Sequence, residues 1–152
     1  MVSHSRQAGF APAQYNLGVM YQDGQGVPQD YAEAMRWYRM SANQGHAGAQ
    51  HNFGFMYDNG LGVPQDYAEA VKWYRMSAKQ GYTRAQTNLG IMYIGGRGVT
   101  KDYVQGHMWF NLAAAQGFEN ARKNRDLVAE QMTAAQIVEA QRLAREWKPT
   151  KQ

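Results

Sequence analysis

The chain has 152 residues, of which 44% are hydrophobic and 18% charged, a composition typical of folded proteins rather than of disordered ones. Its formal net charge of +4 is evenly spread, since residues 1–118 and residues 119–152 each carry +2. No basic block of the kind that binds nucleic acid stands out, so no nucleic-acid partner is expected. The absence of cysteine excludes disulfides, thiolate metal sites and a cysteine nucleophile.

One stretch of about 33 residues occurs three times at an offset of 36 residues, beginning at Ala13, Ala49 and Ala85. Sequence repeats of this length are typical of stacked arrays, which usually work as binding surfaces. We predict repeat one over residues 13–48, repeat two over 49–84 and repeat three over 85–120. Residues 1–12 read as the frayed remnant of a preceding repeat, so we expect the chain to be a fragment of a longer protein.

Each repeat is predicted to hold two helices joined by a glycine-rich turn. Apolar residues at helical spacing predict first helices over 12–22, 47–58 and 83–94. An aspartate three residues before a glutamate or glutamine predicts a capping box at the start of each second helix, over 30–43, 66–79 and 102–115. A glycine recurs inside the first helices, at Gly18, Gly54 and Gly90, where we expect the second helix of the same repeat to approach closely.

The pattern changes after Glu119. The glycine turn disappears, and one helix can run from Glu119 to Gln131. Thr133 and Gln136 form another predicted capping box, which opens a helix ending near Trp147. We therefore predict that residues 121–148 form a C-terminal capping helix pair, and that residues 149–152 are a tail.

The repeated pattern resembles the Sel-one-like repeat (SLR) family, a relative of the tetratricopeptide repeat. In repeat two it is carried by Ala49, Phe53, Gly54, Tyr57, Gly60, Gly62, Val63, Asp66, Ala70, Trp73, Tyr74, Ala78, Gln80 and Gly81. Repeat three departs from it at Thr100, where the others have proline, and at Gly106, where they have alanine. The resemblance implies an all-α, right-handed α/α superhelix of about three helix pairs, of a kind found in bacteria. It also implies an adaptor that gathers other proteins.

No chemistry-bearing constellation emerges from the sequence. The four histidines lack metal-ligand spacing, and the Gly-x-Gly turns follow helices and lack the lysine of a phosphate loop. The repeated aspartates and glutamates could suggest acid–base pairs. Helix capping explains the aspartates, and Glu33 and Glu69 fit as their reciprocal partners in the capping boxes. We therefore expect no catalytic residue, metal or cofactor. No apolar run is long enough to span a membrane, so no membrane partner is expected. The chain does not begin with a recognisable signal peptide, and the sequence does not predict a cellular compartment.

The resemblance places the first helices on a concave face, and helical phase then selects the residues that point into it. We predict a partner-binding surface at Tyr15, Asn16, Val19, Gln22, His51, Asn52, Phe55, Asp58, Thr87, Asn88, Ile91 and Asn124. The near-identical repeats differ mainly here, as a specific site requires, although drift at solvated positions gives the same pattern. An asparagine recurs in every unit. It could bind a peptide backbone, or it could bond the adjacent helix and order the stack.

The favoured interpretation is a protein-interaction module that binds a peptide or a partner helix. One alternative is a β-lactam-binding or hydrolysing enzyme, because a cysteine-rich SLR branch has been linked to that chemistry. That branch depends on disulfides, which this chain cannot form. The other alternative is a structural array that self-associates through its open N-terminal edge.

Overall fold

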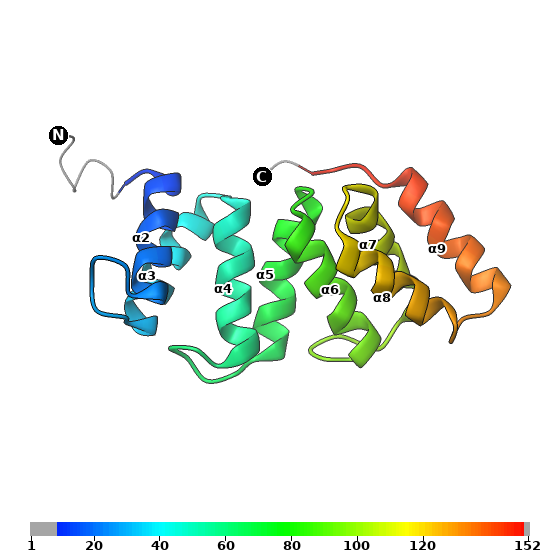
Figure 1. Cartoon of the computed structure of the whole chain (residues 1–152), viewed down its shortest axis with the longest axis horizontal. Coiled ribbons are helices and arrows are strands. Elements are labelled where there is room, and N and C mark those ends of the chain that lie inside the picture. The colour runs from blue at the N-terminus through cyan, green and yellow to red at the C-terminus, as the bar shows by residue number, and fades with distance from the viewer. Residues whose placement is uncertain (1–8, 151–152) are drawn as a thin grey trace. The chain divides into compact units, whose positions relative to one another are not determined.

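The fold is known from a computed structural model, which describes residues 9–150 (Figure 1). Over that range the secondary structure consists of eight helices, which confirms the predicted all-α class: α2 (Ala11–Asp23), α3 (Tyr31–Asn43), α4 (Ala47–Asn59), α5 (Tyr67–Lys79), α6 (Thr83–Gly95), α7 (Tyr103–Ala115), α8 (Glu119–Ala129) and α9 (Ala134–Glu146). Residues 1–8 of the predicted remnant and residues 151–152 of the tail lie outside the described range.

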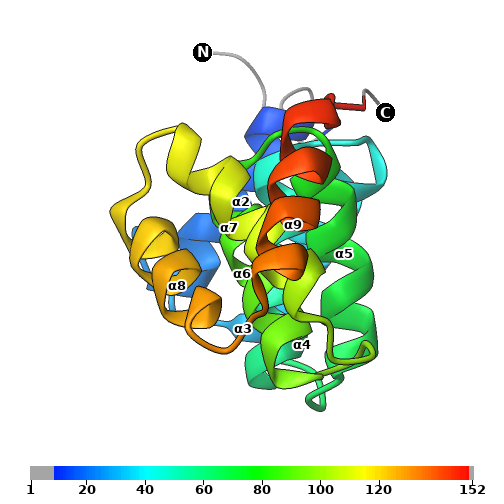
Figure 2. The same cartoon turned by 90° about the vertical axis from the view of Figure 1, so that its right-hand side faces the viewer.

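Two compact units make up the chain, residues 1–73 and residues 74–152, with the boundary inside α5. In the first unit α3 packs against both α2 and α4. In the second unit α7 packs against α6, and also against α8 and α9, which flank it in Figure 2. Consecutive helices therefore pair as repeats, and two further helices cover the last pair.

The second helices begin where the aspartates predict. The Oδ1 atoms of Asp30, Asp66 and Asp102 each accept the backbone N–H three residues later, at 3.1 Å. The predicted reciprocal half of the box is wrong. The backbone N–H of Asp30 donates to the carbonyl of Tyr21 at 2.9 Å, while Glu33 pairs with Arg36 at 3.2 Å. The cap thus ties each second helix to the end of the first, and the same bond recurs in every repeat.

A close approach explains the glycine inside the first helices, as predicted. A Cβ atom on Gly18 would lie 2.4 Å from the ring of Tyr38, and one on Gly90 would lie 2.6 Å from the ring of Phe110. Both rings are buried on the second helix of the same repeat. Since real Cβ atoms do not approach other carbons this closely, only glycine lets the two helices reach this separation.

The C-terminal segment forms one predicted contact and two that the sequence did not predict. Thr133 and Gln136 form the expected capping box at the start of α9. Beyond α9, the indole of Trp147 packs edge-on against Trp109 of α7, with ring centroids 6.1 Å apart. The backbone N–H of Thr150 then donates to the carbonyl of Lys79, the last residue of α5, at 2.7 Å. The tail therefore satisfies one of the carbonyls that a helix end leaves unpaired.

Helix α4 begins at an unusual cap. The Nδ1 atom of His46 accepts the backbone N–H of Ala49 at 3.0 Å, and the imidazole stacks on the ring of Tyr15 at 4.8 Å between centroids. Only a neutral imidazole can accept this bond, because both nitrogens of the protonated ring are donors. Burial also lowers the pKa of His46. The cap is therefore present only while His46 is neutral.

Acidification should weaken this cap. Because the folded pKa of His46 lies below its unfolded value of about 6.5, the cap contributes fully above that pH and is lost as the pH falls below it. We expect the variant His46→Asn, whose amide caps without titrating, to lose about 1 kcal/mol less stability than the parent between pH 7.5 and pH 5. Urea unfolding at the two pH values measures the difference. Equal acid losses in parent and variant would contradict this role of His46.

Candidate functional site

The predicted surface of the first unit combines exposed and buried side chains. Asn16 is exposed, Tyr15, Val19 and Gln22 are half-buried on α2, and Phe55 on α4 has 37% of its surface accessible. Asn52 and Asp58 are half-buried. His51 is buried, so it does not present its side chain to a partner.

A hydrogen-bonded chain links the polar members of this surface. The amide of Asn52 donates to the hydroxyl of Tyr38, which donates in turn to Oε1 of Gln22 at 2.5 Å. The Oδ1 atom of Asn52 lies 2.9 Å from Nδ1 of His51. Burial raises the pKa of Tyr38 above its usual value, with the Asn52 bond acting in the opposite direction. In this unit Asn52 therefore bonds the adjacent helix, the structural alternative considered for the asparagine ladder.

In the second unit the predicted residues also divide by exposure. Thr87 is buried, and its hydroxyl donates to the carbonyl of Thr83 at 3.1 Å. Asn88 and Asn124 are half-buried. Ile91 is exposed, at 41%. Leu127 on α8 is not among the predicted residues, yet its exposed fraction reaches 62%. The apolar surface here is therefore larger than predicted.

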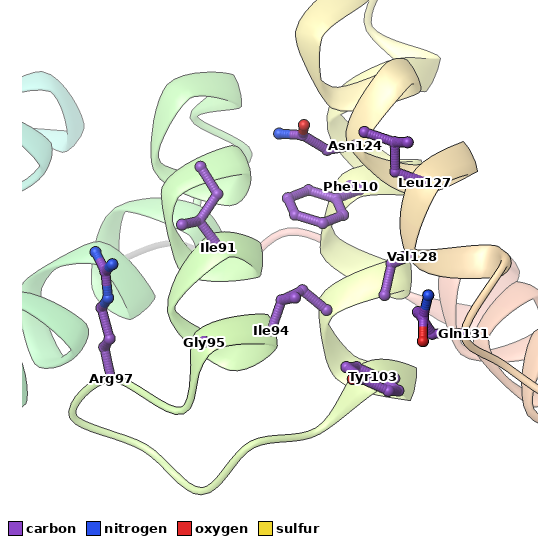
Figure 3. Close-up of a pocket in the computed structure, with 10 residues that line it drawn as sticks. All are labelled: Ile91, Ile94, Gly95, Arg97, Tyr103, Phe110, Asn124, Leu127, Val128 and Gln131. Atoms are coloured by element: carbon purple, nitrogen blue, oxygen red, sulfur yellow. The ribbon is translucent and has the colours of Figure 1, made fainter.

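A pocket of about 450 Å³ opens between α6, α7 and α8 (Figure 3). Its walls are mostly apolar, and they include two predicted site residues, Ile91 and Asn124. Figure 3 shows Arg97 and Tyr103 at the end nearest the α6–α7 loop and Asn124 at the other end. The full lining is Ile91, Ile94, Gly95, Arg97, Tyr103, Phe110, Asn124, Leu127, Val128 and Gln131. Its volume lies in the range of about 300–1,000 Å³ that is typical of ligand pockets.

The two units differ in charge, contrary to the expected even distribution. Residues 74–152 carry twelve lysines and arginines against six aspartates and glutamates, a formal charge of +6. Residues 1–73 carry four against six, a formal charge of −2. The contrast is averaged out when the chain is divided after residue 118, where each part carries +2. The pocket therefore belongs to the strongly basic part of the chain.

The α7–α8 interface beside the pocket contains a buried titratable group. His107 on α7 is buried, and its Nδ1 atom has no hydrogen-bond partner within residues 9–150. Burial lowers the pKa of His107, Arg125 lowers it further, and Asp126 raises it. Arg125 also donates to Oδ1 of Asn111 at 2.9 Å, which joins α8 to α7.

Neither a metal-ligand cluster nor a membrane-spanning helix is present within residues 9–150. No three histidine, cysteine, aspartate or glutamate side chains come together there as a metal site requires. Within the same range, no helix combines the length and the apolar character needed to cross a bilayer.

Comparison with known proteins agrees with the repeat pattern. The family model described as Sel1 repeat matches residues 11–46, 47–82 and 83–118. Among solved structures, the chain is similar to c5321, a protective antigen of uropathogenic Escherichia coli strains with an SLR fold, at 35% identity and a TM-score of 0.87. It is also similar to a Sel1 repeat protein from Oxalobacter formigenes, at 34% identity and a TM-score of 0.77.

These similarities cover most of this chain but a smaller part of each relative. The match to the Escherichia coli protein covers 94% of this chain and 31% of the other. The match to the Oxalobacter protein covers 84% of this chain and 51% of the other. Among curated proteins, none matches the chain.

Proposed function

The chain belongs to the Sel1 repeat family, and from this premise we propose its function. It acts as a protein-interaction module that binds a peptide or a partner helix on the surface of its first helices. Helical repeat arrays of this kind present long surfaces to other proteins.

The observation that carries the proposal is the apolar exposure of the first-helix positions. Phe55 on α4 and Ile91 on α6 occupy the same position of their repeats, and both are exposed although large and apolar. Exposed apolar groups that gather at a pocket often mark a partner site. Ile91 meets this condition, because it lines the pocket of the second unit together with the exposed Leu127.

Selection of peptides from a phage-displayed library of random nonapeptides tests the proposal. A selected peptide that binds the first unit should lose at least about tenfold in affinity with Phe55→Ala, and one that binds the second unit should lose as much with Ile91→Ala. Tenfold corresponds to about 1.4 kcal/mol, which is within reach of one apolar side chain removed from a contact. Fluorescence anisotropy with labelled peptides measures the affinities.

Val138→Ala is the matched control, since Val138 on α9 is also apolar and is 62% exposed, away from the residues that line the pocket. Its affinity for the selected peptides should equal that of the parent. If the library yields no binder, or if the binders respond only to Val138→Ala, the proposal is wrong.

Self-association is a second candidate function, favoured by Phe10. This residue precedes α2 and is largely exposed at the N-terminal edge of the first unit. Light scattering distinguishes the two, since a monomeric mass at high concentration removes the second candidate. The β-lactam-linked branch of the family relies on disulfides, and the chain has no cysteine.

A further inference from the structure

Repeat three differs from repeat one at three positions that contact one another. Repeat one has Gln22, Ala34 and Tyr38, and its buried Tyr38 hydroxyl donates to Gln22 at 2.5 Å. At the corresponding positions repeat three has Ile94, Gly106 and Phe110. A polar pair has therefore been replaced by an apolar pair.

The isoleucine at position 94 requires the glycine at position 106. A Cβ atom on Gly106 would lie 2.2 Å from Cδ1 of Ile94, so alanine at this position is incompatible with the isoleucine. The three residues therefore form one alternative packing arrangement. Ile94 and Phe110 form part of the pocket wall (Figure 3). The replacement removes the hydroxyl and the amide that hold this region together in repeat one.

The same change leaves one amide at the pocket without its usual partner. Asn124 corresponds to Asn52, which donates to the hydroxyl of Tyr38. Phe110 has no hydroxyl, and the side chain of Asn124 forms no hydrogen bond within residues 9–150. A side-chain amide offers both a donor and an acceptor, which suits the backbone of an extended peptide.

Charge selects the kind of peptide. The lining contains no carboxylate, and its one charged residue is Arg97. At the same end, the ammonium of Lys101 lies 5.0 Å from the ring centroid of the lining residue Tyr103. The neighbouring carboxylate of Asp102 caps α7. With a formal charge of +6 over residues 74–152, the unit attracts acidic segments and repels basic ones.

We infer that this pocket binds one large apolar side chain of an acidic peptide segment from a partner protein. The peptide backbone pairs with Asn124, and acidic residues lie toward Arg97 and Lys101. This inference rests on the proposed function and specifies the partner for the second unit.

The test uses the same random nonapeptide library, selected on the full chain. Peptides that depend on Ile91 should contain a large apolar residue within three positions of an aspartate or glutamate. Their affinity should fall at least tenfold in the variant Ile94→Gln/Gly106→Ala/Phe110→Tyr, which restores the residues of repeat one. It should also fall several-fold between 50 and 500 mM salt, because salt screens the attraction between charges. Peptides that depend only on Phe55 should be unaffected by the triple variant.

Asn124→Ala provides a second variant if the triple variant unfolds at a much lower temperature. It should weaken binding several-fold with an unchanged melting temperature. Binders that depend on Ile91 but are basic or wholly polar, or that bind the triple variant and Asn124→Ala like the parent, would overturn the inference and leave the proposed function intact. A dimer that dissociates in the triple variant would also overturn it, since a second copy would then fill the pocket. A library without binders would overturn both proposals.

Discussion

Trp109→Ala should destabilise the chain by about 3–5 kcal/mol, the usual cost of deleting a large buried aromatic side chain. Trp109 is buried on α7, and it carries the contact with Trp147 that holds the C-terminal segment. Removing the indole would leave a cavity and would also remove the contact with Trp147. Chemical unfolding of parent and variant measures the free energy of unfolding.

Trp109→Phe is the informative control. The indole N–H of Trp109 is buried and donates to no other residue within 9–150, as is also true of Trp37 and Trp73. Phenylalanine keeps an aromatic ring and loses no hydrogen bond, so its cost should be less than half that of alanine. Equal costs for the two variants would show that this position needs the whole indole, rather than any aromatic ring.

Gly90→Ala should destabilise the chain by up to about 2 kcal/mol. Overpacking a buried contact costs about 1–3 kcal/mol, and the better helix propensity of alanine offsets about 1 kcal/mol. The added methyl has no room to move, since it would meet the Phe110 ring at 2.6 Å and the carbonyl of Gly106 at 3.2 Å. Thermal unfolding should show a lower melting temperature.

Gly95→Ala, in the same helix, should have the opposite sign. Gly95 is exposed, and its added Cβ would make only an ordinary contact with Arg97 at 3.6 Å. Alanine there should be neutral or stabilising by up to about 1 kcal/mol. A Gly90→Ala variant as stable as Gly95→Ala would contradict the close helix approach described above.

The sequence predicted the features that depend on local chemistry. The positions of Asp30 and Thr133 predicted the starts of α3 and α9, because a helix cap involves residues close in the chain. The recurrence of Gly18 and Gly90 predicted the close helix approach, since a costly residue kept in every repeat needs a packing reason.

Features that depend on distant residues were not predictable in the same way. The backbone N–H of Asp30 bonds Tyr21 across the turn rather than Glu33, which the local motif could not reveal. Helical phase placed His51 and Thr87 on the binding surface, but phase gives only a direction, and neighbouring side chains bury both residues. The sequence showed that repeat three has Gly106 where the other repeats have alanine. The reason for this glycine became clear only from its contact with Ile94.

Nuclear magnetic resonance of methyl groups tests the central claim most directly. The sample is the methyl-labelled chain bound to a selected peptide whose affinity depends on Ile91. The account predicts intermolecular Overhauser effects between the apolar side chain of that peptide and the methyl groups of Ile94 and Val128. Both residues lie in the pocket wall. The methyl groups of Val138 should stay unperturbed. Overhauser effects at Val138, or none at Ile94 and Val128 in the saturated complex, would contradict the account.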